Sequence, residues 1–255
     1  MNSAALRNIL NQFDPISLEE MDRVLLMDRT DLKFNFHDSR LPELLDRVKD
    51  AYLALDVADT RMTRYETLYY DTEDFSFYSE HHNEHANRYK IRLRRYVESD
   101  TNFFEIKFKN NKGRTIKTRV LRKDRHHDIE ENSEKLLRDI TPIEAGSLRP
   151  KLWVNYNRIT LVNKTEEERV TVDFNMEMRM NENTVDFPSL VIVEVKQVRP
   201  RETALVRALR KMHIHEGGTS KYCIAVSKLV SDIKKNNFKP DLITIKKIIN
   251  DNPAA

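Results

Sequence analysis

The sequence predicts an α+β fold in which an antiparallel β-barrel forms a tunnel and helices pack on its outside. Several segments of strand length alternate charged with apolar side chains, helical segments lie between them, and most of the alternating charges are cations. Because side chains alternate between the faces of a strand, each of these strands has one charged and one apolar face. A sheet closed into a barrel gives the helices an apolar outer surface and keeps the charges inside.

The clearest alternating segment runs from Arg88 to Tyr96. Read as a strand, it places cations on one face and apolar residues on the other. The cations are Arg88, Lys90, Arg92 and Arg94. Consecutive like charges repel each other, so this face is better suited to a polyanion such as phosphate, whose oxygens Arg binds in pairs. For this strand alone, a solvated face of an open sheet is the alternative.

The same alternation recurs in segments 28–36, 103–109, 116–120, 151–162, 169–174 and 190–198. Single acids interrupt the cations at Glu105, Asp173 and Glu194. A barrel with a charged interior is a tunnel for a multiply charged ligand rather than a packed core. Its acids can hold Mg²⁺ or Mn²⁺, since these hard cations take carboxylate and phosphate ligands.

Helices are expected around these strands. Ser17 and Glu20 form a capping box that predicts a helix to about Leu26. Further helices are expected over 39–53, 75–86, 130–140, 201–213 and 242–249, the last docked on the core. The predicted organisation is an N-terminal helical segment (1–26), a tunnel domain (27–227) and a C-terminal tail helix (228–255).

Composition excludes several classes of protein. The net charge of the 255 residues is only +3, so cations that bind an anion must be gathered in one site. Cys223 is the only cysteine, which excludes an intrachain disulfide and suits a reducing cytoplasm. With four glycines, no P-loop or dinucleotide fingerprint is present. No apolar stretch approaches the ~20 residues of a membrane span. Nucleic acid is not an expected partner, because aromatic residues do not interleave with the cationic face.

A series of short patterns in order resembles the vacuolar transporter chaperone (VTC) domain. This is the polyphosphate polymerase branch of the triphosphate tunnel metalloenzymes, or CYTH-like superfamily. The patterns run from about Arg29 to Tyr222. They are Arg29-x-Asp31-x-Lys33, Tyr69-Tyr70-Asp71-Thr72, Arg92-x-Arg94-x-Tyr96, Glu105-x-Lys107, Lys117-x-Arg119, Tyr156-x-Arg158, Arg169-x-Thr171-x-Asp173, Glu194-x-Lys196 and Ser220-Lys221-Tyr222.

The resemblance implies a tunnel that binds ATP, triphosphate or polyphosphate together with Mn²⁺ or Mg²⁺. The implied phosphate-binding residues are Lys33, Arg92, Arg94, Lys107, Lys117, Arg119, Tyr156, Arg158, Arg169, Lys196, Ser220 and Lys221. Those expected to act in catalysis are Lys33, Arg92, Arg94, Lys107, Arg158, Arg169 and Glu194. Glu194 is also the expected metal ligand.

The first pattern favours one activity within the superfamily. Hydrolytic tunnel enzymes typically begin with Glu-x-Glu-x-Lys, whereas Arg29 and Asp31 precede Lys33 here. Fewer acids and an added cation favour a longer anion, and hence an ATP-dependent polyphosphate polymerase. Without the sensor domain and membrane anchor of eukaryotic polymerases, the chain resembles stand-alone bacterial members. A metal-dependent triphosphatase, on inorganic or organic triphosphate, and a non-catalytic polyphosphate-binding protein remain alternatives.

Two further features have ordinary surface roles as their alternatives. His81 and His85 lie four residues apart on an expected helix and could ligate zinc, but no third ligand is in view, which favours a polar helix. The cations of the helix over 201–213 form a basic outer patch. It is either a solvated face or a docking site for emerging polyphosphate or an acidic regulator.

Overall fold

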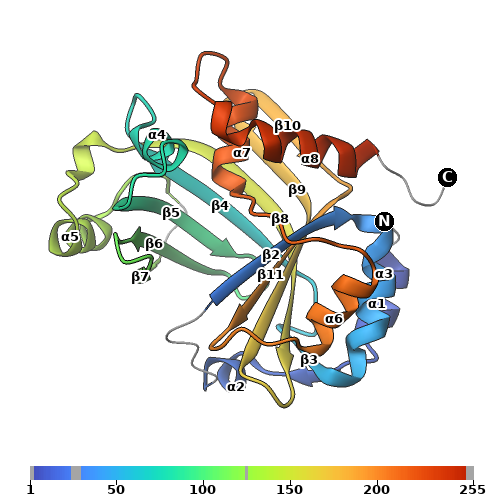
Figure 1. Ribbon diagram of the computed structural model, residues 1–255. Coiled ribbons are helices and arrows are strands. Elements are labelled where there is room, and N and C mark those ends of the chain that lie inside the picture. Colours follow the sequence, from blue (N-terminus) through green and yellow to red (C-terminus); the bar gives the residue numbers. More distant parts are fainter. Residues whose placement is uncertain (1–2, 24–29, 124–125, 251–255) are drawn as a thin grey trace.

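One large antiparallel sheet runs through the molecule (Figure 1). The computed structural model describes residues 3–23, 30–123 and 126–250. The hydrogen-bonded strand order is β2-β11-β9-β8-β4-β5-β6-β7. These strands are β2 (Thr30–His37), β4 (Thr63–Asp71), β5 (Arg88–Tyr96), β6 (Thr101–Lys109), β7 (Thr115–Arg122), β8 (Arg149–Asn163), β9 (Glu168–Met180) and β11 (Leu190–Gln197). Short strands extend the sheet: β10 (Asn183–Phe187) on β9, β3 (Tyr52–Leu55) on β8 and β1 (Asp14–Ile16) on β3.

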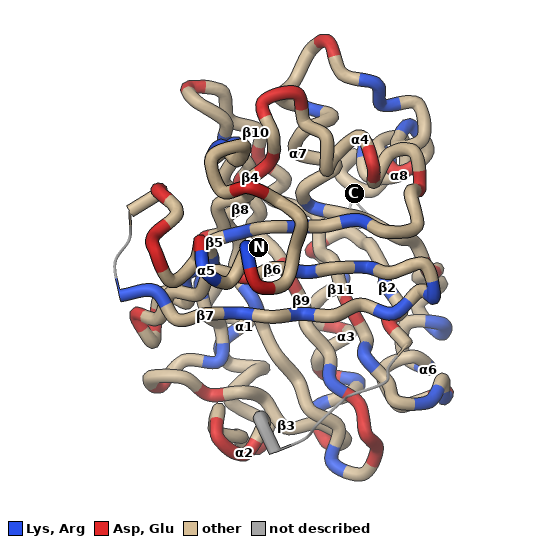
Figure 2. The backbone as a smooth tube through the Cα atoms, turned by 90° about the vertical axis from the view of Figure 1, so that its left-hand side faces the viewer, with Lys and Arg blue, Asp and Glu red and all other residues tan. Residues whose placement is uncertain are grey.

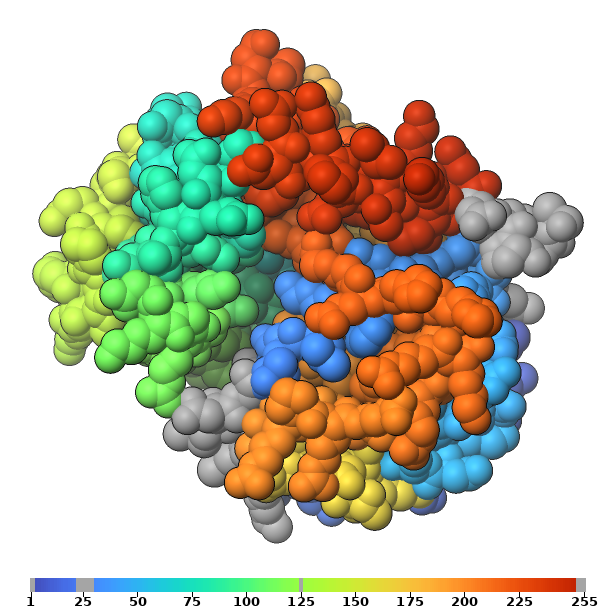
Figure 3. Space-filling view, in the orientation of Figure 1, coloured from blue at the N-terminus to red at the C-terminus, as the bar shows by residue number. Residues whose placement is uncertain are grey.

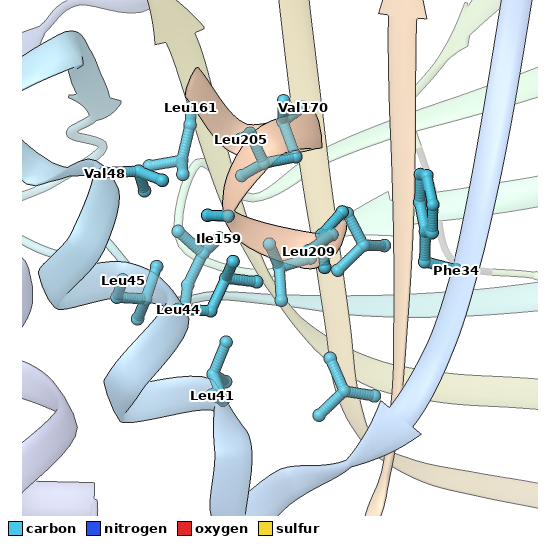
Figure 4. Packing of buried hydrophobic residues seen from close by; sticks show 14 of the residues in the cluster. Phe34, Leu41, Leu44, Leu45, Val48, Ile159, Leu161, Val170, Leu205 and Leu209 are labelled. Carbon is cyan, nitrogen blue, oxygen red and sulfur yellow. The ribbon is translucent and has the colours of Figure 1, made fainter. Parts of the chain in front are cut away.

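Helices cover the apolar face of this sheet, as the alternation predicts, and they also cover one end of the opposite face. They are α1 (Ser3–Leu10), α2 (Leu18–Arg23), α3 (Leu41–Val48), α4 (Ser76–His82), α5 (Glu131–Ile140), α6 (Ala204–Lys211), α7 (Lys221–Leu229) and α8 (Lys239–Asn250). Leu44 of α3 and Leu209 of α6 pack with Ile159 and Val170 of the sheet (Figure 4). Further along the same face, Leu137 of α5 joins another buried cluster. Within the described ranges, no helix is long and apolar enough to cross a membrane.

The opposite, inner face is divided between charge and apolar packing. At one end, α7 and α8 cover it with a cluster that includes Ile224, Ile245, Met176 and Met178. In the space-filling view, the red C-terminal residues lie directly above the orange stretch that leads into α7 (Figure 3). The predicted docking of the tail helix is therefore observed. The charged part of the inner face occupies the remaining length.

The α+β class, the antiparallel sheet and the outer helices agree with the prediction, but the sheet is tunnel-like rather than closed. Among the described residues, β2 and β7 are the two ends of the strand order and do not pair with each other. Part of the free edge of β2 is already occupied. Phe34 bridges to Glu216, and the amide of Gly217 donates to the carbonyl of Lys33 at 2.9 Å. Residues 216–217 thus take the hydrogen bonds that a closing strand would need there.

The structure differs from the sequence predictions at the ends of some helices and strands. The capping box is confirmed, since Ser17 N donates to Glu20 Oε2 at 2.9 Å and Glu20 N to Ser17 Oγ at 3.2 Å. The predicted N-terminal helical segment also contains the strand β1. This strand has only three residues, too few to show an alternating pattern in the sequence. The expected helix over 75–86 was too long, because α4 ends at His82. The expected end at Leu26 and the residue Arg29 lie outside the described residues.

Candidate anion-binding site

The strand registers align the predicted cations in rows across one wall of the site. Lys90, Lys107 and Lys117 are register partners on β5, β6 and β7. The next row along these strands is Arg92, Glu105 and Arg119. Partners in antiparallel strands project from the same face, so these side chains form one surface. Figure 2 shows Lys and Arg recurring along these three strands.

A second wall comes from β2, β11, β9 and β8. Glu194 of β11 lies between Lys33 and Thr171 in the registers of its neighbours. The next row contains Asp31, Lys196 and Arg169. Arg158 of β8 is opposite Asp173 of β9. The structure therefore brings candidates from strands that are distant in the sequence onto one continuous inner face.

Glu105 is buried and neutralised on the first wall. Arg92 Nε lies 2.7 Å from Glu105 Oε2, and Lys117 Nζ lies 2.5 Å from Oε1. Burial would raise the pKa of the Glu105 carboxyl, but Arg92, Arg94 and Lys117 together hold that pKa well below its usual range. The carboxylate stays charged and orients the Arg92 guanidinium.

Asp173 has the same role on the second wall. Arg158 binds it through two parallel hydrogen bonds of 2.6 and 2.7 Å, and Lys221 Nζ lies 2.6 Å from Oδ2. Burial would raise the pKa of Asp173, yet Arg158 and Lys221 lower that pKa to about 2. The Arg158 guanidinium also lies 4.7 Å from the ring centre of Tyr65, which stacks on Tyr156. Arg158 is thus held on several sides before any ligand binds.

Glu194 is the acid best placed to share a metal with a ligand. Lys196 Nζ lies 2.7 Å from its Oε2. Burial would raise the pKa of Glu194, but Lys196, Lys33 and Lys107 hold that pKa well below its usual range, so a carboxylate is present. The described residues contain no group of His, Cys, Asp and Glu large enough to cage a metal. One carboxylate fits Mg²⁺ or Mn²⁺ bound jointly with phosphate oxygens, which is how Mg²⁺ commonly binds.

Some described cations of the inner face have no carboxylate within ion-pair distance. Among the described residues, Lys33, Arg94 and Lys107 form no ion pair. Arg94 is 6% exposed and donates to the Tyr156 hydroxyl at 2.9 Å. Burial and the neighbouring Lys90 lower the pKa of Lys107 to about 7. Positive charge is therefore in excess on this face, which favours an anionic ligand.

The remaining predicted residues differ in how far they reach into the site. Lys117 and Arg119 are on the exposed edge strand, where Arg119 stacks over the Phe103 ring at 4.4 Å. Arg169 is half-buried beside Lys196. Ser220 begins α7 as its N-cap, since its Oγ accepts from Cys223 N.

Two inner-face residues were absent from the phosphate-binding residues that the family resemblance implied. Lys90 Nζ donates to Ser220 Oγ at 2.9 Å. Its alternation with Arg92 was visible in the sequence, but no family pattern includes it. Thr171 presents a buried hydroxyl that has no hydrogen-bond partner within the described residues. A threonine carries no charge signal, so only its position between Arg169 and Asp173 could have indicated it.

The zinc interpretation of His81 and His85 is not supported. Because α4 ends at His82, His85 does not lie on the helix with His81. Burial, together with Lys90 and Arg88, lowers the pKa of His81 to about 2, so this imidazole is neutral. No cluster of three or more potential ligands occurs in the described part of the chain.

Residues 28–230 match the model of the VTC domain family. The chain belongs to the VTC domain family. This confirms the resemblance seen in the sequence patterns. Comparison with curated proteins gives no significant match.

Several solved structures are similar to this VTC domain at low sequence identity. A candidate adenylate cyclase from Bacillus halodurans is 14% identical, with a TM-score of 0.51 over 80% of this chain and 100% of that chain. One from Vibrio parahaemolyticus is 13% identical, with a TM-score of 0.49 over 79% and 99%. A third, from Hippeastrum, is described as having a dominant triphosphatase activity; it is 15% identical, with a TM-score of 0.48 over 79% and 96%.

Proposed function

We propose that this VTC domain protein is an ATP-dependent polyphosphate polymerase that transfers the γ-phosphoryl group of ATP to a growing polyphosphate chain. The observation that carries the proposal is the excess of cations on the inner face. Glu105, Asp173 and Glu194 are each neutralised by neighbouring cations. The charge of Lys33, Arg94 and Lys107 is then balanced by the ligand. The family match supports a triphosphate or polyphosphate as that ligand.

The inner face suits phosphoryl transfer, which depends on positioning and on charge stabilisation more than on covalent help from the protein. Arg92 and Arg158 are pre-oriented by buried carboxylates, so little side-chain freedom is lost when they bind phosphate oxygens. An oxygen of the terminal phosphate of the chain bonds to Pγ as the bond from Pγ to the bridging oxygen breaks, and ADP leaves with the electron pair. The excess cations stabilise the charge on the transferring group.

No side chain is required as nucleophile or base, since the attacking oxygen is already anionic. Burial raises the pKa of the Cys223 thiol, which keeps it protonated and unreactive. A single free cysteine suits a reducing compartment, so the cytoplasm remains the expected location.

Glu194 is the residue that would hold Mn²⁺ or Mg²⁺ in this reaction. When bound, the metal neutralises charge on phosphate oxygens. Lys196 and Lys33 flank the carboxylate and are placed to bind the same phosphates. The two lysines also keep Glu194 ionised, as a metal ligand must be.

A metal-dependent triphosphatase is the second candidate, and the open side of the sheet favours it. Lys117 and Arg119 of the edge strand β7 are exposed, so water reaches this wall of the site. If the γ-phosphoryl group were transferred to water in place of a phosphate chain, the same cations would stabilise its charge. A non-catalytic polyphosphate-binding protein is the remaining alternative.

Incubation of the protein with ATP and either Mn²⁺ or Mg²⁺ tests the proposal. We expect ADP and long phosphate chains that are resolved on a gel, and loss of both in Arg94→Ala. Free phosphate without chains would support the triphosphatase instead. Binding of tripolyphosphate without turnover would support the binder. Absence of binding and turnover would overturn the assignment of this face to phosphate.

A further inference from the structure

Residues 216–222, which we call the strap, follow α6, begin on the free edge of β2 and end in the first turn of α7 (Figure 1). The strap is attached there through Glu216 and Gly217. Asn35 Nδ2 also donates to Thr219 Oγ1 at 2.5 Å. A Cβ on Gly217 would lie 3.9 Å from the Asn35 side chain, so the approach is close but unstrained. The near end of the strap is therefore fixed to β2.

The far end of the strap delivers polar groups to both walls of the inner face. Ser220 Oγ accepts from Lys90 of β5, and Lys221 Nζ lies 2.6 Å from Asp173 of β9. Lys221 also lies 5.0 Å from the ring centre of Tyr156. The strap thus crosses the tunnel and connects three parts of the sheet that are distant in sequence.

A buried bond fixes the first turn of α7, where the strap ends. Tyr222 donates its hydroxyl to Asp71 Oδ2, and its ring packs on Tyr69 at 5.0 Å between ring centres. Asp71 is itself immobilised at the end of β4, because it accepts backbone N–H groups of Phe77 at 2.9 Å and Tyr78 at 3.0 Å. Burial and the Asp71 carboxylate raise the pKa of Tyr222 well above its usual range, so the hydroxyl remains a donor.

We propose that Tyr222, anchored by Asp71, is a positioning residue that places Lys221 and Ser220 for triphosphate binding. The proposal rests on the function proposed above. Tyr222 follows Lys221 directly in the first turn, so a shift of its ring moves the Lys221 ammonium. Among the described residues that donate to Asp71, only Tyr222 comes from α7. When several cations bind one ligand together, even a small displacement of one of them lowers the affinity for the ligand.

Tyr222→Phe removes only the hydroxyl, and Tyr78→Phe is its matched control. The Tyr78 hydroxyl is also buried and bonded to α7, but at the other end of that helix, through Ser227 Oγ at 2.9 Å. The measurement is calorimetric binding of inorganic tripolyphosphate at fixed salt, with thermal unfolding alongside. We expect the Kd to rise about tenfold or more in Tyr222→Phe and less than about twofold in Tyr78→Phe. Equal changes in Kd for the two variants would overturn the proposal.

A double variant separates positioning from general loosening of the fold. If Tyr222 acts through Lys221, then Tyr222→Phe should raise the Kd by less than about twofold in a Lys221→Ala background. If Tyr222→Phe raised the Kd as much in the Lys221→Ala background as in the wild type, the proposal would be overturned. Should Tyr222→Phe not fold, Asp71→Asn is expected to give the same loss of affinity. The backbone amides of Thr72 and Phe77 would hold the one remaining acceptor oxygen, and the NH2 group, which only donates, would then face the Tyr222 hydroxyl. A wild type that does not bind tripolyphosphate would instead overturn the proposed function and this inference with it.

Discussion

Asp173 and Arg158 face each other across β9 and β8 and form a two-pronged ion pair, with 2.6 Å between Arg158 Nε and Asp173 Oδ1. Their side chains are 3% and 13% exposed. Lys221 shares the carboxylate. Removing Asp173 would leave two cations in a poorly solvated place, so this pair contributes to stability as well as to the site.

We predict that Asp173→Asn lowers the free energy of unfolding by about 3 kcal/mol at pH 7, as expected when a buried pair loses one partner. Glu202→Gln is the control, since its pair with Arg210 is exposed and should contribute less than about 1 kcal/mol. The folded-state pKa of Asp173 is about 2, below its unfolded value of about 3.9. Its stabilisation is therefore complete above about pH 4 and is lost as the pH falls towards 2. Urea unfolding of both variants checks this, and equal losses would contradict it.

The inner face could be predicted from the sequence because alternation is a local property. Arg92 and Arg94 are two residues apart, so they must share a face of any strand. Their partners could not be predicted in this way. The pairing of Arg92 with Glu105 depends on the β5–β6 register, and that of Arg158 with Asp173 on the β8–β9 register.

The sequence predicted a closed barrel, and it could not show that the sheet stays open between β2 and β7. Ser220 and Lys221 were identified through a family pattern, but the path of the strap depends on the contact of Gly217 with Lys33 across the chain. No periodicity marks residues 216–219. The apolar end of the inner face also escaped prediction. Met176 and Met178 alternate with Glu177 and Arg179, so the pattern gives one apolar and one polar face but does not show that the apolar face points inward.

Triphosphate binding should weaken as the pH rises through the pKa of Lys107. This group has a pKa of about 7, mainly because it is half-buried beside Lys90, so it is largely neutral at pH 9 in the free protein. A bound polyanion stabilises the protonated form, and binding above pH 7 must therefore include proton uptake. We expect Lys107→Arg to lose less affinity than the wild type between pH 7 and 9, because arginine stays charged. Calorimetry in buffers of different ionisation enthalpy measures the uptake. Parallel pH profiles would contradict the assignment.

Metal-dependent turnover should require the Glu194 carboxylate. Glutamine keeps the size of this side chain but removes the charge that a hard cation needs. We predict that Glu194→Gln abolishes turnover of ATP at every Mn²⁺ and Mg²⁺ concentration while thermal unfolding shows an intact fold. The control is Glu202→Gln on the outside of the molecule. Unchanged activity in a metal titration would transfer the ligand role to Asp173 or Glu105.

Affinity for triphosphate should depend on Arg94 far more than on a cation of the outer helix. Arg94 is 6% exposed and, among the described residues, forms no ion pair, so its charge acts on the ligand. The Arg210 side chain is 68% exposed and is screened by water and salt. We predict that Arg94→Ala weakens binding by about 2 kcal/mol or more, whereas Arg210→Ala changes it by at most about 0.5 kcal/mol.

Calorimetry with a non-hydrolysable ATP analogue, at one fixed salt concentration, measures both variants. The comparison is matched, since each change removes one guanidinium from the same protein. Equal and small losses would mean that a diffuse basic surface holds the phosphate. The basic patch on α6 would then be the docking surface for the phosphate ligand. A non-catalytic polyphosphate-binding protein would be favoured over the polymerase.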